Sequence, residues 1–205
     1  GTNHDIGGSL ALFAGPDLGT LTYYGIVYDG ISGDSDGGTL LAPHYQPCEP
    51  VLWQPAPDTL ACCVRTETGM DFGVSHAPFQ RWQWTDTKKH LHPSAILETP
   101  HGWLLAGREV RPVVAPQQRR NLPAIPPLPP IWKTALYELH AGHTIPRHLL
   151  TLPSGGDCGY AGLALGKERD TVFVSFYSQH RHEDPSKIST LPGANVWLAT
   201  VAIEA

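Results

Sequence analysis

The chain has 205 residues, enough to bury a substantial core as one domain. Its apolar content of 41% is ordinary, but 21 glycines and 20 prolines favour many turns between short strands, and therefore an all-β fold. The net charge of −5 and the lack of a Lys/Arg run argue against nucleic acid or an anionic membrane as a partner, and no apolar run reaches the roughly 18 residues of a membrane span.

The first two strands are expected before residue 30. The segment 9–14 is apolar, and the segment 20–28 is rich in threonine, tyrosine, isoleucine and valine, which favour strands. A Gly/Pro/Asp turn at 15–19 separates the two segments, so we predict a hairpin. The loop that follows, SGDSDGGTL at 32–40, is dense in turn-forming residues.

Two segments of 17 residues are copies of one unit. EPVLWQPAPDTLACCVR occupies residues 49–65, and HPSAILETPHGWLLAGR occupies residues 92–108, an offset of 43 residues. Both copies have proline at the second and ninth positions and arginine at the last. A third segment, YAGLALGKERDTVFVSFY at 160–177, fits the same frame with one extra residue and ends in tyrosine where the others end in arginine.

A repeat of this length built from short strands is typical of β-propeller blades. We therefore predict a single domain of about four blades, at residues 1–46, 47–90, 91–145 and 146–205. A proline-rich insert at 111–131 interrupts the third blade, because its seven prolines cannot take part in regular ladder pairing.

The repeat also predicts a pocket. In each hairpin the first and last residues return to the same end, and propeller blades surround a common axis with equivalent strands innermost, so these end residues should ring one site. Arginine is suited to hold a carboxylate there, because its guanidinium is planar and permanently charged. The expected pairs are Glu49 with Arg65, His92 with Arg108, and Tyr160 with Tyr177. Asp157 and His180, which flank the third hairpin, are predicted to contact the substrate as well.

Metal and cofactor sites are not expected. His140 and His143 follow a predicted strand in a loop, where no helix holds the pair together. The four cysteines show no C-x-x-C spacing, and Cys62 and Cys63, as neighbours in one strand, should point to opposite faces.

The repeated segments resemble the sialidase (neuraminidase) superfamily, which consists of six-bladed propellers with BNR or Asp-box repeats. Residues 49–65 look like the family segment in which a glutamate precedes the second arginine of a carboxylate-binding triad. Arg108 resembles the third arginine of that triad, and the segment around Tyr160 is similar to the tyrosine-bearing segment. The ending, GGDCGYAGLAL through VSFYSQH to NVWLATV, is especially similar to bacterial sialidase-like proteins.

The Asp-box pattern S-x-D-x-G-x-x-W is present in degraded form. Ser75 and Trp82 keep its spacing, whereas Ala77 and Phe79 replace the aspartate and the glycine. The loop at 32–40 is a second imperfect copy.

The resemblance implies a glycoside hydrolase in which Tyr160 attacks the sugar, Glu49 accepts the tyrosine proton, and arginines hold the substrate carboxylate. A neutral tyrosine suits this substrate, since a carboxylate nucleophile would be repelled by the carboxylate of a sialic acid, and sialidases depart in this way from the two-carboxylate rule. The expected partner is therefore a glycan, and the resemblance favours a secreted or periplasmic location.

Two family parts are not found, namely the first arginine of the triad and the aspartate acid/base. Six blades need about 270 residues, so we expect an incomplete six-bladed propeller, either a fragment or a shortened relative. Two alternatives stay open: a carbohydrate-binding or scaffolding propeller without chemistry, and a polysaccharide lyase. An uncovered propeller edge would also favour self-association.

Overall fold

A computed structural model gives the fold. The residues that it describes are 9–14, 22–29, 48–66, 69–111, 131–167, 170–181, 184, 187 and 193–203, with the backbone alone for the first two ranges. Residues 112–130 of the expected insert and the loop at 32–40 lie outside this part of the chain. The described chain is all-β, as predicted, and contains no helix that is long and apolar enough to cross a membrane.

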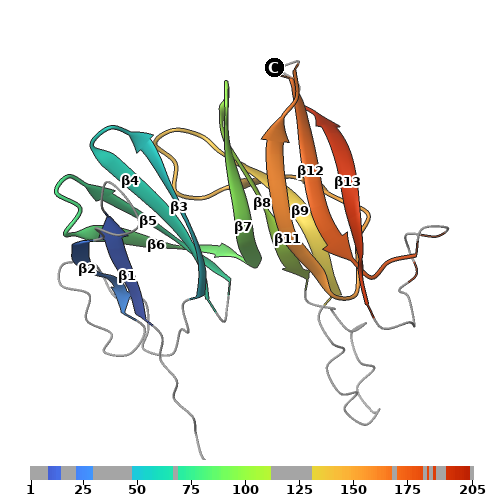
Figure 1. Ribbon diagram of the computed structural model, residues 1–205, viewed down its shortest axis with the longest axis horizontal. Coiled ribbons are helices and arrows are strands. Elements are labelled where there is room, and N and C mark those ends of the chain that lie inside the picture. The colour runs from blue at the N-terminus through green and yellow to red at the C-terminus, as the bar shows by residue number, and fades with distance from the viewer. Residues whose placement is uncertain are drawn as a thin grey trace, which may run out of the picture.

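The described strands form four antiparallel sheets, none of which closes on itself. In each sheet, strands that are consecutive in the sequence are neighbours, so every sheet is an up-and-down meander (Figure 1). The first sheet is the predicted N-terminal hairpin, β1 (Ser9–Ala14) and β2 (Thr22–Asp29). The second contains β3 (Cys48–Ala56), β4 (Thr59–Arg65), β5 (Met70–His76) and β6 (Trp82–Lys89). The third contains β7 (Leu91–Thr99), β8 (Gly102–Arg111), β9 (Ile131–Leu139) and β10 (Arg147–Thr151). The fourth contains β11 (Cys158–Leu165), β12 (Thr171–Ser178) and β13 (Asn195–Ala202).

The two copies of the repeat unit fold alike. Each forms a hairpin whose turn falls at the ninth and tenth residues of the unit, because proline at the ninth position cannot donate to the ladder. In the second copy His92 pairs directly with Arg108, and in the first copy Arg65 pairs with the residue before Glu49. The predicted meeting of the ends of these hairpins is therefore confirmed.

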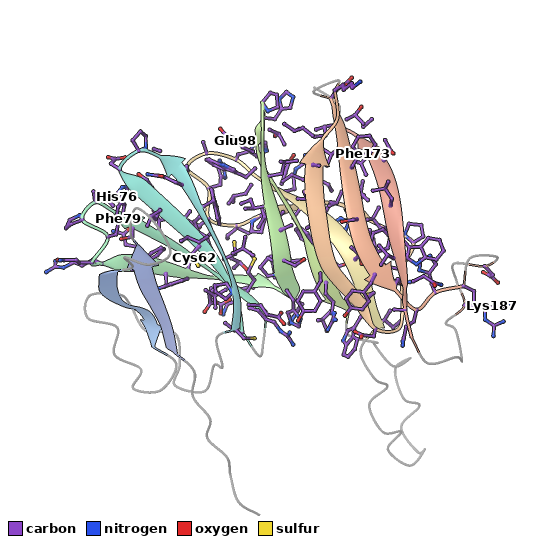
Figure 2. All side chains as sticks on the ribbon, viewed as in Figure 1. Cys62, His76, Phe79, Glu98, Phe173 and Lys187 are labelled. Carbon is purple, nitrogen blue, oxygen red and sulfur yellow. The ribbon has the colours of Figure 1, made fainter. Side chains whose placement is uncertain are left out.

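The three larger sheets stand side by side, with the β7–β10 sheet in the middle (Figure 1). This middle sheet buries both faces, and side chains fill the space on each side of it (Figure 2). Leu105 of β8 packs toward the β3–β6 sheet, whereas its neighbours Leu104 and Ala106 pack toward the β11–β13 sheet. Burial on both faces explains why β8 and β9 are apolar without alternation, and each buried leucine contributes about 2 kcal/mol.

The turn between β5 and β6 is flanked by Ser75 and Trp82, the two residues that keep the spacing of the Asp-box pattern. Ser75 lies opposite Trp82 in the ladder, and its hydroxyl donates to the carbonyl oxygen of Arg81 at 2.6 Å. Phe79, at the position of the motif glycine, has a φ of 63°, a conformation that glycine adopts without strain. This turn therefore has, at Phe79, a backbone conformation that favours glycine.

The outer face of the β11–β13 sheet is apolar. Val196 and Leu198 are 83% and 71% exposed, and Phe173 of the adjacent strand is also exposed. Among the described strands β13 pairs with β12 alone, so its other edge has no partner there. Such an edge with apolar side chains is a surface prone to association.

We expect the substitution Leu198→Glu to reduce self-association, because it places a charge in the centre of this apolar surface. The measurement is sedimentation velocity across a range of protein concentrations. Ile145→Glu is the matched control, since Ile145 is a 55% exposed apolar residue in the turn between β9 and β10. Equal behaviour of the two variants would show that this face does not mediate association.

Candidate functional site

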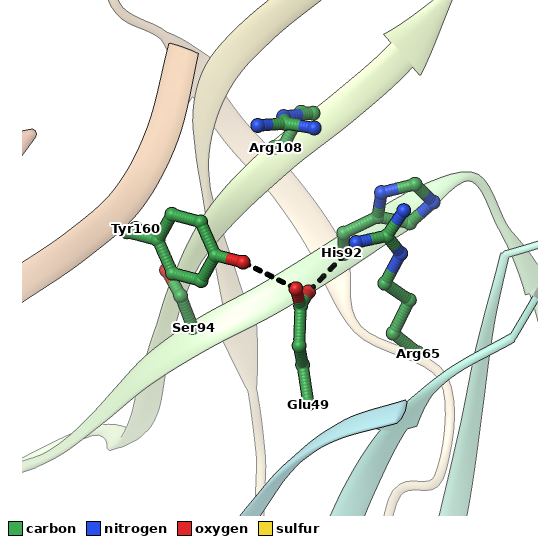
Figure 3. A pocket seen from close by; sticks show the side chains of 6 residues that line it. All are labelled: Glu49, Arg65, His92, Ser94, Arg108 and Tyr160. Atoms are coloured by element: carbon green, nitrogen blue, oxygen red, sulfur yellow. Dashed lines mark hydrogen bonds and ion pairs between the residues drawn. The ribbon is translucent and has the colours of Figure 1, made fainter. Parts of the chain in front are cut away.

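Strands from three sheets bring their ends to one small pocket. Strand β7 contacts both β3 and β11, so the first strand of the middle sheet lies between the first strands of the two outer sheets. Each sheet contributes side chains to the pocket from these strands or from the strand that follows (Figure 3). The lining residues are Glu49 from β3, Arg65 from β4, His92 and Ser94 from β7, Arg108 from β8, and Tyr160 from β11. Five of these six residues were predicted from the repeat.

Glu49 is the centre of the site. Tyr160 donates its phenolic hydrogen to Oε1 of Glu49, and Arg65 donates from Nη1 to Oε2 at 2.9 Å. Figure 3 shows these two side chains approaching the carboxylate from opposite sides. Tyr160 and Glu49 come from different sheets and are 111 residues apart in the sequence, so this contact depends on how the sheets pack.

The same contacts determine where the proton lies. Partial burial raises the pKa of Glu49, but the hydrogen bonds from Tyr160 and Arg65 outweigh it, and the net pKa is lower than usual. The hydrogen bond to the Glu49 carboxylate raises the pKa of Tyr160 above its ordinary value. At neutral pH the carboxylate is therefore ionised and the phenol is protonated, which is the starting state for a tyrosine with a carboxylate base.

This coupling can be tested without any substrate. We expect Glu49→Gln to lower the pKa of Tyr160 toward the ordinary value of about 10, because the amide carries no charge to oppose phenolate formation. The measurement is a pH titration of tyrosine labelled with carbon-13 at Cζ, with Tyr160→Phe used to assign the signal. Glu98→Gln removes an exposed carboxylate elsewhere on β7 and should leave the titration unchanged. An unchanged pKa in Glu49→Gln would contradict the described contact.

Arg108 is held by several partners at once. Its Nε donates to the carbonyl oxygen of Cys158, and its Nη2 donates to Asp157 at 2.9 Å and to the hydroxyl of Tyr177 at 2.7 Å. The guanidinium also lies over the ring of Trp132, 4.8 Å from its centroid. Arg108 is thus well ordered, with a side chain that is only 14% exposed.

Asp157 and Tyr177, both predicted as substrate contacts, lie at this side of the site as partners of Arg108. The Tyr177 hydroxyl also donates to Asp157 at 2.8 Å, and its ring stacks on that of Tyr160 with centroids 6.0 Å apart. The Asp157 side chain is 53% exposed, so this carboxylate lies at the solvent side of Arg108. The two arginines therefore face the pocket with carboxylates of the protein already bound.

His92 is a neutral imidazole in this setting. Burial and the nearby charges of Arg65 and Arg108 lower its pKa to about 4. Its Nδ1 atom is buried and has no hydrogen-bond partner among the described residues. A neutral imidazole carries one donor and one acceptor nitrogen and no charge.

The backbone at the two central residues is strained. Glu49 has a φ of 50° and Tyr160 a φ of 43°, both in the left-handed region that side chains other than glycine rarely adopt. Each such residue costs on the order of 1 kcal/mol or more, and residues of this kind cluster at functional sites. The strain therefore agrees with a functional role for the two residues.

His180 does not reach the pocket. It is 2% exposed, its ring stacks on Trp197 at 4.0 Å between centroids, and its Nδ1 lies 2.7 Å from the hydroxyl of Ser178. Packing of its ring on Trp197 therefore places this histidine in the interior rather than at the predicted rim.

A metal site is also absent from the described residues, where no group of three or more His, Cys, Asp or Glu side chains is arranged to hold an ion. All four cysteines are free. Cys62 and Cys63 belong to different core clusters, as their expected opposite orientation requires.

Ser94 is the pocket residue that the sequence did not reveal. Ser94 follows the proline of the second repeat copy, whereas the first copy has valine at this position. This difference between the copies is the one feature of the sequence that points to Ser94. Its hydroxyl accepts a hydrogen bond from the backbone N–H of Ala161 at 2.8 Å, so it links β7 to the strand of Tyr160.

Comparison with models of known protein families, with curated proteins and with solved structures finds no match.

Proposed function

We propose that this chain is a sialidase-like glycoside hydrolase, or part of one, with Tyr160 as nucleophile and Glu49 as its base. The observation that carries the proposal is the hydrogen bond between the Tyr160 hydroxyl and the Glu49 carboxylate, which joins two sheets inside a pocket that also contains two arginines. A tyrosine and a glutamate paired in this way are the groups that hydrolysis of a carboxylate-bearing sugar needs.

A propeller of the sialidase type is the architecture that we propose for the sheets. Meanders of three or four strands that stand side by side, with their first strands in contact, are the arrangement of blades around an axis. The turn between β5 and β6 supports this reading, since Ser75, Trp82 and the left-handed Phe79 occupy the positions of an Asp box.

The proposed chemistry begins with attack of the Tyr160 oxygen on the anomeric carbon. That bond forms as the bond from the anomeric carbon to the leaving oxygen breaks, and the phenolic proton passes to Oε1 of Glu49. The raised pKa of Tyr160 keeps the proton on the phenol at rest. Transfer becomes favourable as positive charge develops on the sugar, since a cation beside the oxygen stabilises the phenolate. The leaving oxygen departs as an oxyanion and takes a proton from solvent. Water then attacks the anomeric carbon and releases a proton to solvent as the bond to the Tyr160 oxygen breaks, and Glu49 returns the phenolic proton to that oxygen.

The arginines would hold the substrate carboxylate. Among contacts with described residues, Arg65 uses one of its three guanidinium nitrogens, and Nη1 of Arg108 is unused. A substrate carboxylate can bind at these positions and displace the exposed Asp157 from Arg108. His92 would add a hydrogen bond to a hydroxyl or amide of the sugar.

An aryl α-sialoside tests the proposal most directly. A phenolate of low pKa leaves without protonation, so its hydrolysis does not require a general acid. We expect measurable turnover that Glu49→Gln reduces about a hundredfold, since general base catalysis contributes on this scale. Binding of free sialic acid without turnover would instead indicate a carbohydrate-binding module, and absence of both would reject the proposal.

A further inference from the structure

Tyr160 stands on an irregular part of β11. The ladder between β11 and β12 shifts register between Gly159 and Gly162, so Tyr160 and Ala161 have no partner residue in β12. The φ angles of Gly159 and Tyr160 are 136° and 43°, both in the left-handed region. Ladder pairing with β12 therefore does not fix the backbone of Tyr160, and the contact that β12 makes with this residue is the stacking of Tyr177 on its ring.

Two side chains of the middle sheet instead form hydrogen bonds with the backbone of this irregular segment. On one side of Tyr160, Arg108 donates from Nε to the carbonyl oxygen of Cys158. On the other side, the Ser94 hydroxyl accepts from the N–H of Ala161 at 2.8 Å. The same hydroxyl lies 3.4 Å from the carbonyl oxygens of Ala106 and Ala161, either of which can accept its hydrogen.

The position of the Tyr160 side chain depends on these hydrogen bonds. Its side chain reaches into solvent, with the residue 61% exposed, so packing alone does not hold it. Ala161 is only 5% exposed, and its N–H would lose its partner if the Ser94 hydroxyl were removed. Tyr160 could then relax from the left-handed region to a negative φ, which would turn the phenol away from Glu49.

We propose that Ser94 is a positioning residue for Tyr160: its hydroxyl anchors the bulged segment of β11 to β7 and so holds the phenol against the Glu49 carboxylate. The inference rests on the proposed function only for its catalytic meaning, because the placement of the phenol is a property of the folded chain. The competing explanation is that Ser94 merely joins two sheets, in which case its loss would lower stability without changing the environment of Tyr160.

The experiment compares Ser94→Ala, Ser94→Cys and Ser94→Thr with the unmodified chain by the carbon-13 titration of the tyrosine Cζ signals. Alanine removes the acceptor, cysteine replaces it with a weaker one of similar size, and threonine keeps the hydroxyl. We expect the pKa of Tyr160 to fall toward about 10 in Ser94→Ala and to fall by less in Ser94→Cys. In Ser94→Thr we expect this pKa to be unchanged. Ser94→Cys provides the answer if Ser94→Ala does not fold.

An unchanged pKa of Tyr160 in folded Ser94→Ala or Ser94→Cys would overturn the proposal. A pKa of Tyr160 that falls as far in Ser94→Thr as in Ser94→Ala would also overturn it. Turnover of the aryl sialoside gives a second readout, in which Ser94→Ala should lower kcat about tenfold and leave KM nearly unchanged. The titration does not depend on that activity. Absence of turnover in the unmodified chain would therefore reject the proposed function and leave the placement of Tyr160 still testable.

Discussion

Replacement of Tyr160 by phenylalanine is expected to lower the rate of hydrolysis of an aryl sialoside about a thousandfold or more, because loss of a nucleophile reduces rates on this scale. Phenylalanine preserves the ring that stacks on Tyr177 and removes the oxygen that would bond to the sugar. The loss should therefore appear in kcat, with little change in stability.

Covalent trapping makes this prediction specific. With a 2,3-difluorosialic acid, fluoride leaves from the anomeric carbon and the second fluorine slows hydrolysis of the adduct, so the sugar should accumulate on the nucleophile. Mass spectrometry of a digest should then find it on Tyr160. Tyr177→Phe is the control, because that hydroxyl contacts Arg108 and Asp157 rather than Glu49; this variant should still be labelled, though more slowly. Labelling of Tyr160→Phe to the same extent would remove Tyr160 from the chemistry.

The second large effect is expected from Gly107→Ala. A Cβ atom on Gly107 would lie 2.1 Å from the carbonyl oxygen of His92 and 2.8 Å from Cα of Pro93, both backbone atoms that cannot rotate away. The two strands would have to separate at the start of β7, next to the pocket. We expect the free energy of unfolding, measured by urea denaturation, to fall by about 3 kcal/mol.

Gly142→Ala is the matched control for this substitution. It adds the same methyl group at a turn where no atom lies within 4 Å, and its only penalty is the left-handed φ of 77°. That penalty should amount to about 1 kcal/mol. If the two variants lost equal stability, the close approach of β7 to β8 at Gly107 would not be real.

The sequence predicts the hairpins well because their turns are marked by proline and their ends by charged or aromatic residues. Register within a hairpin follows from the position of its turn, so placing Arg65 beside Glu49, and Arg108 beside His92, required only the repeat. Strand β10 was not predicted, because RHLLT is short and lacks the alternation that marks a half-buried strand.

The parts of the site that the sequence did not predict depend on contacts between sheets. The hydrogen bond from the Ala161 N–H to Ser94 and the one from Arg108 to the Cys158 carbonyl join residues far apart in the chain, and no local pattern encodes them. His180 is the opposite case. It follows the end of the third hairpin in the sequence and was therefore predicted at the rim of the pocket, but it packs in the interior against Trp197. The left-handed φ angles of Glu49 and Tyr160 also have no sequence signature, because neither residue favours that conformation.

The middle sheet, apolar on both faces, affects how the pocket can come apart. Either outer sheet can detach by exposing one interface, whereas the middle sheet cannot unfold without exposing two. Glu49 and Tyr160 belong to the two outer sheets, so detachment of either one separates the pair. Such partial opening costs less free energy than global unfolding. The fraction of molecules with an intact Tyr160–Glu49 pair is therefore expected to fall on heating before the chain as a whole unfolds, so that activity is lost ahead of structure.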